Sequence, residues 1–192
     1  MDFIEFADYF VLNNVFSVHA WVYALGSGDD MTLFSKDRNG NPDANNHEFI
    51  NFGVNEDLRF EVGLAPHDTS VGYATRLADK SMSVNSWTYV VFIMSVVDSK
   101  NTQVTIECNE DGVIETETWN NTIFEDKSNY EAFIGIQSNS SEAPSKSNPW
   151  YGYIYEFHIH QSAGKSYRLT TGCDGCTDCP LSSECPWDVT WT

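Results

Sequence analysis

Hydrophobic and polar residues alternate with a period of two along much of this sequence. Two clear examples are residues 16–23 and residues 58–64, whose apolar positions are Phe16, Val18, Ala20 and Val22 in the first and Leu58, Phe60, Val62 and Leu64 in the second. This alternation is typical of β-strands that bury one face and expose the other. No long segment follows the 3.6-residue period of an amphipathic helix, so the pattern predicts an all-β fold.

Further strand signals follow one another at short intervals. They cover residues 31–35, 49–54, 71–77, 102–108, 113–118 and 132–137. Residues 87–97 are apolar on both faces, which predicts a central strand; a buried helix is the alternative, but the β-branched content favours a strand. The dipeptide Asp111-Gly112 lies between two alternating runs and predicts a hairpin, because glycine tolerates positive φ. Many short strands joined by polar turns predict a sandwich of two antiparallel sheets.

Residues 151–160 predict the last long strand of this sandwich, because aromatic and β-branched residues dominate them. Unbroken alternation would place Tyr153, Tyr155, Phe157 and Ile159 on one face, and Ile154, Glu156, His158 and His160 on the other. Residues 16–23 and 87–97 are the predicted neighbours of this strand. Gly152 near its start indicates a bulge or a close approach of another backbone.

The charge balance excludes several classes of partner. The 192 residues include 10 Lys and Arg against 28 Asp and Glu, a formal net charge of −18. Binding to nucleic acid or to anionic lipid depends on positive charge, so neither is expected. No apolar run reaches about 18 residues, so we predict no membrane-spanning segment and no direct membrane insertion. The acidic excess permits calcium binding, since hard cations prefer oxygen ligands, although solubility alone also explains it.

Six stretches, taken in order, resemble the laminin G-like, concanavalin A-like lectin/glucanase family. They are residues 16–22 (Phe-Ser-Val-His-Ala-Trp-Val), 33–36 (Leu-Phe-Ser-Lys), 58–62 (Leu-Arg-Phe-Glu-Val), 87–91 (Trp-Thr-Tyr-Val-Val), 104–112 (Val-Thr-Ile-Glu-Cys-Asn-Glu-Asp-Gly) and 151–159 (Tyr-Gly-Tyr-Ile-Tyr-Glu-Phe-His-Ile). The resemblance covers about residues 8–163 and implies a two-sheet antiparallel jelly-roll β-sandwich. It does not fix the function, because the family includes lectins, adhesion modules, hydrolases and spacers.

The last part of the chain differs in composition, so we predict a sandwich domain of residues 1–163 and a short disulfide-rich C-terminal tail of residues 164–192. Its cysteines are Cys173, Cys176, Cys179 and Cys185. Two disulfides in a small secreted module are the favoured interpretation, since the tail has almost no apolar core. A zinc knuckle and an iron–sulfur cluster are the alternatives; five residues precede the fourth cysteine, where a ferredoxin run has three. Cys108 is expected to be a buried thiol on the inward face of its strand.

The cysteine pattern of the tail also indicates where the protein is located in or outside the cell. It resembles the start of a Cys-rich, growth-factor-receptor-like repeat, which implies that more repeats follow in a longer protein. Residues 1–5 lack the basic and apolar regions of a signal peptide. We therefore expect an extracellular or cell-surface location as part of a longer chain. Asn120 and Asn139 begin Asn-x-Thr/Ser tripeptides and are predicted glycosylation acceptors in that location.

Three groups of residues are candidates for binding. The resemblance implies a calcium ion at a loop rim, for which Asp29, Asp30 and Asp37 are the candidate ligands, although Asp-rich loops are often only turns. Trp119, Trp150 and Tyr151 lie near Asn residues and are candidates for stacking on a sugar; the alternative is that both Trp residues cap the ends of the sandwich. Glu156, His158 and His160 are spread along one strand, so a polar strand face is favoured there over a metal site.

The leading functional prediction is a non-catalytic recognition or adhesion module that binds a glycan or an extracellular protein. A structural subunit or repeat of a surface filament or scaffold, formed by self-assembly, is the alternative. A glucanase-like hydrolase is third, because the family's hydrolases carry Glu-x-Asp-x-x-Glu on one strand and this sequence does not. Paired carboxylates across a groove are needed for that chemistry, so we predict that the protein is not an enzyme.

Overall fold

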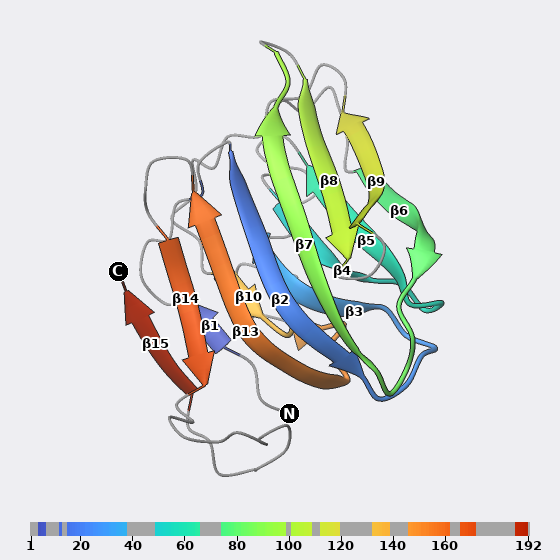
Figure 1. Cartoon of the computed structure of the whole chain (residues 1–192), viewed down its shortest axis with the longest axis vertical. Helices are drawn as coiled ribbons and strands as arrows, with labels where there is room; N and C mark the ends of the chain where they lie inside the picture. The colour runs from blue at the N-terminus through green and yellow to red at the C-terminus, as the bar shows by residue number, and fades with distance from the viewer. Residues whose placement is uncertain are drawn as a thin grey trace.

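The computed structural model describes residues 4–6, 12, 15–37, 49–65, 74–98, 101–108, 112–119, 132–138, 146–161, 166–171 and 187–191. Within these residues the chain is all-β, as predicted, and forms a six-stranded sheet, a seven-stranded sheet and a two-stranded ribbon. Figure 1 shows the seven-stranded sheet in front of the six-stranded one. The two antiparallel sheets are consistent with a jelly-roll sandwich. No helix among the described residues is long and apolar enough to cross a membrane.

The six-stranded sheet contains the shorter strands. Its order is β1 (Ile4–Phe6), β10 (Ala132–Ile134), β3 (Met31–Asp37), β4 (Phe49–Val54), β5 (Arg59–Ala65) and β6 (Ala74–Ser81). The ribbon pairs β11 (Gln137–Ser138) with β12 (Lys146–Ser147). The alternating residues of β5 bury Phe60, Val62 and Leu64 against the other sheet, as the period-two pattern predicts.

The seven-stranded sheet contains the longest strands. Its order is β15 (Trp187–Trp191), β14 (Ser166–Thr171), β13 (Gly152–Gln161), β2 (Phe16–Ala24), β7 (Trp87–Val96), β8 (Thr102–Cys108) and β9 (Gly112–Trp119). The central position of β7 and the β8–β9 pairing predicted from Asp111-Gly112 are confirmed. β13 pairs directly with β2, as predicted, whereas β7 lies on the other side of β2 and does not pair with β13. Cys108 is half-buried and packs against the core, on the inward face of β8.

The predicted tail has two strands in the described part of the chain. β14 and β15 continue the seven-stranded sheet outward from β13, at its left edge in Figure 1. The four cysteines of the tail lie outside the described residues. The disulfides and the division of the chain at residue 163 therefore stay predictions.

A β-bulge in β13 overturns the predicted assignment of its faces. The pairing with β2 shifts between Tyr155 and His158, and Glu156 there has a φ of 50°. One extra residue reverses which side chains point inward. As a result Phe157 is buried, whereas Tyr153 and Tyr155 are each 40% exposed. The two tyrosines lie on the outer face, together with His158 and His160, instead of lying with Phe157 and Ile159.

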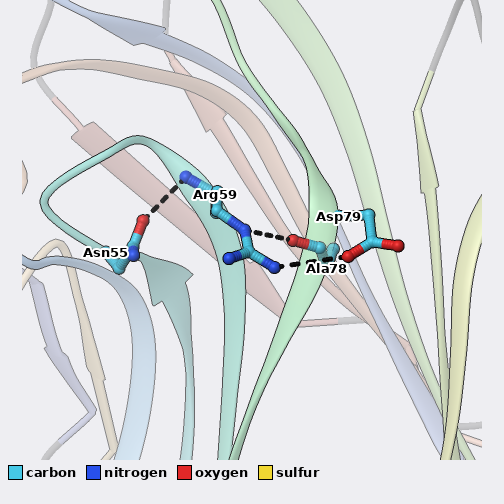
Figure 2. Close-up of polar contacts among 4 residues, drawn as sticks. All are labelled: Asn55, Arg59, Ala78 and Asp79. Carbon is cyan, nitrogen blue, oxygen red and sulfur yellow. Dashed lines mark hydrogen bonds and ion pairs between the residues drawn. The ribbon is translucent and has the colours of Figure 1, made fainter.

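A tight turn joins β4 to β5. The Asn55 side-chain Oδ1 accepts the backbone N–H of Asp57 (3.1 Å) and of Arg59 (2.9 Å). Figure 2 shows how Arg59 then reaches β6, where its Nε donates to the Ala78 carbonyl oxygen at 2.7 Å. Its Nη2 also lies 3.5 Å from an oxygen of Asp79. One side chain thus ties the turn to the edge strand.

Candidate functional site

Six aromatic side chains gather on the outer face of the seven-stranded sheet. We call this group the aromatic surface; its members are Trp21 and Tyr23 on β2, Trp87 and Tyr89 on β7, and Tyr153 and Tyr155 on β13. Strand register explains the gathering, since Tyr153 pairs with Tyr23 and Tyr155 with Trp21. Trp87 and Tyr89 pair with the same two residues from the other side. Two rows of three rings therefore cross three adjacent strands.

The rings of the aromatic surface contact one another. Tyr23 lies 5.4 Å from Trp87 and 5.7 Å from Tyr153 between ring centroids. Trp21 lies 5.3 Å from Tyr89, and Trp87 lies 6.3 Å from Tyr155. Tilted and edge-to-face rings at these separations attract one another and limit each other's movement. The surface is thus an ordered array of ring faces and edges that is partly open to solvent.

Three histidines continue this face along the same strands. We call His19, His158 and His160 the histidine cluster. The ring of His160 lies 4.9 Å from that of His19 and 5.9 Å from that of His158, between centroids. His160 is exposed, and the other two are half-buried. The cluster exists because the bulge in β13 turns His158 and His160 to the side that carries His19.

Hydrogen bonds join the histidine cluster to the aromatic surface. The Nδ1 of His19 lies 3.0 Å from the Tyr89 hydroxyl, and its Nε2 lies 2.8 Å from the Ser17 hydroxyl. Burial, together with the nearby His160 and His158, lowers the pKa of His19 from 6.5 to about 4. Burial also raises the pKa of the Tyr89 hydroxyl, with Glu156 as a second cause. His19 and Tyr89 are therefore both uncharged at neutral pH.

Trp150 and Tyr151, two of the predicted stacking residues, differ in exposure. Trp150 is 7% exposed. Its backbone N–H donates to the Gly135 carbonyl oxygen, and its Nε1 donates to the Tyr23 carbonyl oxygen at 3.3 Å. Its ring belongs to the core, in line with the alternative that it caps the sandwich. Tyr151 is 59% exposed and its carbonyl accepts the N–H of Leu25.

Two of the calcium candidates, Asp29 and Asp30, lie in the loop that contains Gly26, which packs near Tyr151, whereas the third, Asp37, lies at the far end of β3. Asp29 and Asp30 are exposed in this loop, and Asp37 ends β3. Within the described residues no group of three or more His, Cys, Asp or Glu side chains could hold a metal ion. Calcium at Asp29, Asp30 and Asp37 stays a prediction.

The remaining predicted site residues lie wholly or partly outside the described structure. Trp119 is the last residue of β9, but its side chain is not described. Asn120 and Asn139 lie outside the described residues. The aromatic surface was not predicted from the sequence, because its rings come from stretches far apart in the chain. The available signal was the spacing of Trp21 and Tyr23, and of Trp87 and Tyr89, at alternate positions of neighbouring strands.

A family model described as the concanavalin A-like lectin/glucanases superfamily matches residues 2–166. The chain belongs to this superfamily. The resemblance seen in the sequence is confirmed for the sandwich, and the match ends before the four cysteines. No match to a curated protein was found.

Several solved structures share the superfamily fold with low sequence identity. A native heptameric SAP-like pentraxin from Limulus polyphemus is 13% identical over 82% of this chain and 68% of its own, with a TM-score of 0.53. The sialidase CBM40 of Ruminococcus gnavus, bound to α2,3-sialyllactose, is 12% identical over 80% and 86%, with a TM-score of 0.55. The LG1-3 region of the laminin α2 chain is 11% identical over 82% and 30%, with a TM-score of 0.53. At these identities the similarity establishes the fold alone.

Proposed function

We propose that this domain is a non-catalytic recognition module that binds carbohydrate on its aromatic surface. The observation that carries the proposal is the pair of tyrosines, Tyr153 and Tyr155, each 40% exposed and backed by four further rings. Sugar rings present C–H faces that pack on aromatic rings, and a rigid array of Tyr and Trp binds at a small cost in side-chain entropy. The hydroxyl of Tyr89 and the exposed His160 add polar groups at one end.

Two other findings support the proposal. Tyr151 lies two residues before Tyr153 and is also exposed, so it extends the available aromatic area to the rim that the sequence suggested. The Ruminococcus gnavus neighbour of the same fold is a carbohydrate-binding module bound to sialyllactose. Extracellular location is part of the proposal, and it rests on the cysteine pattern of the tail.

A binding experiment with variants tests the proposed surface. We expect the full chain to bind a subset of glycans on an array, and Tyr153→Ala with Tyr155→Ala to weaken that binding at least about tenfold, as truncated aromatic contact residues commonly do. Val97→Ala is the control, since Val97 is exposed beyond the end of β7 opposite to Trp87. A blank array, or equal binding by the double variant and the control, would contradict the proposal.

Calcium binding is a separate part of the proposal, and carbohydrate binding at the aromatic surface does not depend on it. If Asp29, Asp30 and Asp37 held the ion, calcium at about 100 times its Kd would stabilise the fold by about 2.7 kcal/mol. The measurement is the melting temperature with added calcium and with chelator, for the wild type and for Asp30→Asn. An equal melting temperature in both conditions would rule out a structural calcium ion.

Self-assembly into a filament or scaffold is the second candidate function. The pentraxin of similar fold is heptameric, which supports this candidate. Sedimentation velocity across about a hundredfold range of concentration would detect it, because association depends on concentration by mass action. A concentration-dependent shift to a defined oligomer, together with a blank glycan array, would favour this candidate over carbohydrate recognition.

A further inference from the structure

The strands that carry the aromatic surface, and β8 beside β7, contain no cation of fixed charge, whereas β14 on the other side of β13 contains Arg168. Neither Lys nor Arg occurs in β2, β7, β8 or β13. The acidic residues of these strands are Glu107 on β8 and Glu156 at the bulge of β13. Glu156 raises the pKa of Tyr89, which places its negative field at the edge of the aromatic surface. The charged residues of these four strands are therefore all acidic, in line with the chain's net charge of −18.

His19, which contacts Tyr89, does not supply a positive charge at the aromatic surface. His19 stays neutral because it is half-buried, and both of its ring nitrogens have hydroxyl partners in Ser17 and Tyr89. A neutral imidazole has one N–H donor and one acceptor nitrogen. Along this row, Arg168 of β14 is the register partner of His158, and Glu107 pairs with Val91 on the far side of His19. Among the described positions of this row, the cation Arg168 is thus next to His158, at the end of the row opposite to Glu107.

These groups match the chemistry of sugar hydroxyls. A hydroxyl both donates and accepts, as do the Tyr89 hydroxyl and a neutral imidazole. A carboxylate or sulfate, in contrast, accepts only and is best held by Arg or by several N–H groups. Placing it close to Glu156 without a cation would be repulsive.

We infer that the aromatic surface takes a neutral, hydroxyl-rich sugar and discriminates against anionic ones, with His160 and the Tyr89 hydroxyl as its polar contacts and His19 as the residue that positions Tyr89. The inference rests on the proposed function and adds the ligand class. His19 positions Tyr89 through its 3.0 Å contact with the Tyr89 hydroxyl, which fixes where that oxygen lies. The similarity to a sialyllactose-bound module therefore extends to the fold and not to the charge of the ligand.

The test is a glycan array in which each neutral oligosaccharide is paired with its sialylated or uronate-capped form, read with the full chain. We expect the neutral member of each bound pair to give at least about a tenfold higher apparent affinity. The preference should shrink when salt is raised from about 0.05 M to about 0.5 M, because screening weakens charge repulsion. Val97→Ala should leave the preference unchanged, since Val97 is exposed beyond the end of β7 and lies outside the inferred contacts.

Histidine variants test the polar contacts. We expect His160→Ala to weaken neutral-sugar binding at least about fivefold, and His19→Ala to do the same. His19→Gln should restore most of the binding, because an amide can both donate and accept. Melting temperatures of all variants identify any that simply unfold.

Each outcome of these experiments bears on one of the two proposals. Binding to neither member of any pair would contradict the proposed function, and this inference with it. Tighter binding to the anionic members would overturn the inference while leaving carbohydrate recognition in place. Unchanged neutral-sugar affinity in folded His160→Ala and His19→Ala would overturn the assignment of the polar contacts.

Discussion

The ring of Phe52 stacks on the ring of Phe92, with centroids 4.7 Å apart and planes inclined by 15°. Phe52 lies on β4 of the six-stranded sheet and Phe92 on β7 of the seven-stranded sheet. Each ring is at most 1% exposed, and each also contacts a further phenylalanine, Phe34 and Phe60 respectively. The stack therefore joins the two layers at the centre of the core, directly behind the strand that carries Trp87 and Tyr89.

Phe52→Ala should lower the free energy of unfolding by about 3–5 kcal/mol, because it removes a large buried ring and leaves a cavity between the sheets. Urea unfolding followed by fluorescence measures this loss. Phe52→Ala, Phe92→Ala and the double variant form a cycle in which we expect a coupling of about 0.5–1.5 kcal/mol. Val97→Ala, at an exposed site, should change the stability by less than about 0.5 kcal/mol. Full additivity in the cycle would mean that the stacked geometry contributes nothing beyond burial.

Gly152 is required by a close approach of two backbones. A Cβ at this position would lie 1.8 Å from the Tyr23 carbonyl oxygen, the same oxygen that accepts the Trp150 indole N–H. Gly152→Ala should therefore force β13 away from β2 and destabilise the fold by more than about 3 kcal/mol, an overpacking effect against rigid backbone. The prediction from sequence that this glycine marks a close approach is confirmed.

Gly28→Ala is the matched comparison for that substitution. Gly28 also has a positive φ, 110°, but a Cβ added there would meet no other atom within 4 Å. The substitution should cost only the backbone strain, of about 1–3 kcal/mol. Equal melting temperatures for Gly28→Ala and Gly152→Ala would show that conformation, and not the clash with Tyr23, limits position 152.

The sequence is sufficient to predict most of the fold because period-two patterning reflects burial directly. Phe16, Val18, Ala20 and Val22 are all buried, as their alternation predicts. The predicted face assignment in β13 is wrong, because a bulge adds one residue between Tyr155 and His158 and so breaks the alternation of faces. No glycine in Tyr155-Glu156-Phe157 indicates this bulge in the sequence. The extra residue of the bulge places Tyr153 and Tyr155 on the face opposite to Phe157.

The candidate site was therefore much less predictable than the fold. Its six rings meet only through the pairing of three strands that are distant in sequence. Trp150 and Tyr151 are adjacent and share an aromatic character, but one lies in the core and the other is exposed. The Trp150 indole has a backbone acceptor within reach, the Tyr23 carbonyl, and this tertiary contact has no local signature in the sequence.

Arg59 should matter more for stability than its ion-pair partner. Its Nε donates to the Ala78 carbonyl at 2.7 Å, whereas Asp79 has a side chain that is 98% exposed. Exposed ion pairs contribute little, but losing a charged donor to a backbone carbonyl costs about 1–3 kcal/mol. Arg59→Ala should thus lower the urea midpoint clearly, and Asp79→Ala should leave it close to the wild type. A larger effect of Asp79→Ala would assign the stability to the ion pair instead.

Glu61 on β5 gives the fold a pH dependence of known sign. Burial raises the pKa of its carboxyl above the ordinary 4.5, and Asp30 raises it further. The folded protein therefore binds this proton more tightly than the unfolded chain does. Its contribution to stability is fully present below the ordinary carboxyl pKa and is lost as the pH rises through the raised value.

Glu61→Gln should consequently be more stable than the wild type at pH 7, with an advantage that fades as the pH falls toward about 4. Urea unfolding at several pH values measures the difference, and Glu56→Gln, in the exposed turn between β4 and β5, is the control. The experiment also bears on calcium. A cation bound at Asp30 would offset the repulsion with Glu61, so adding calcium at pH 7 should then reduce the advantage of Glu61→Gln. An advantage that is independent of pH would show that the volume or hydrogen bonding of the introduced amide, and not the loss of the carboxylate charge, causes the change.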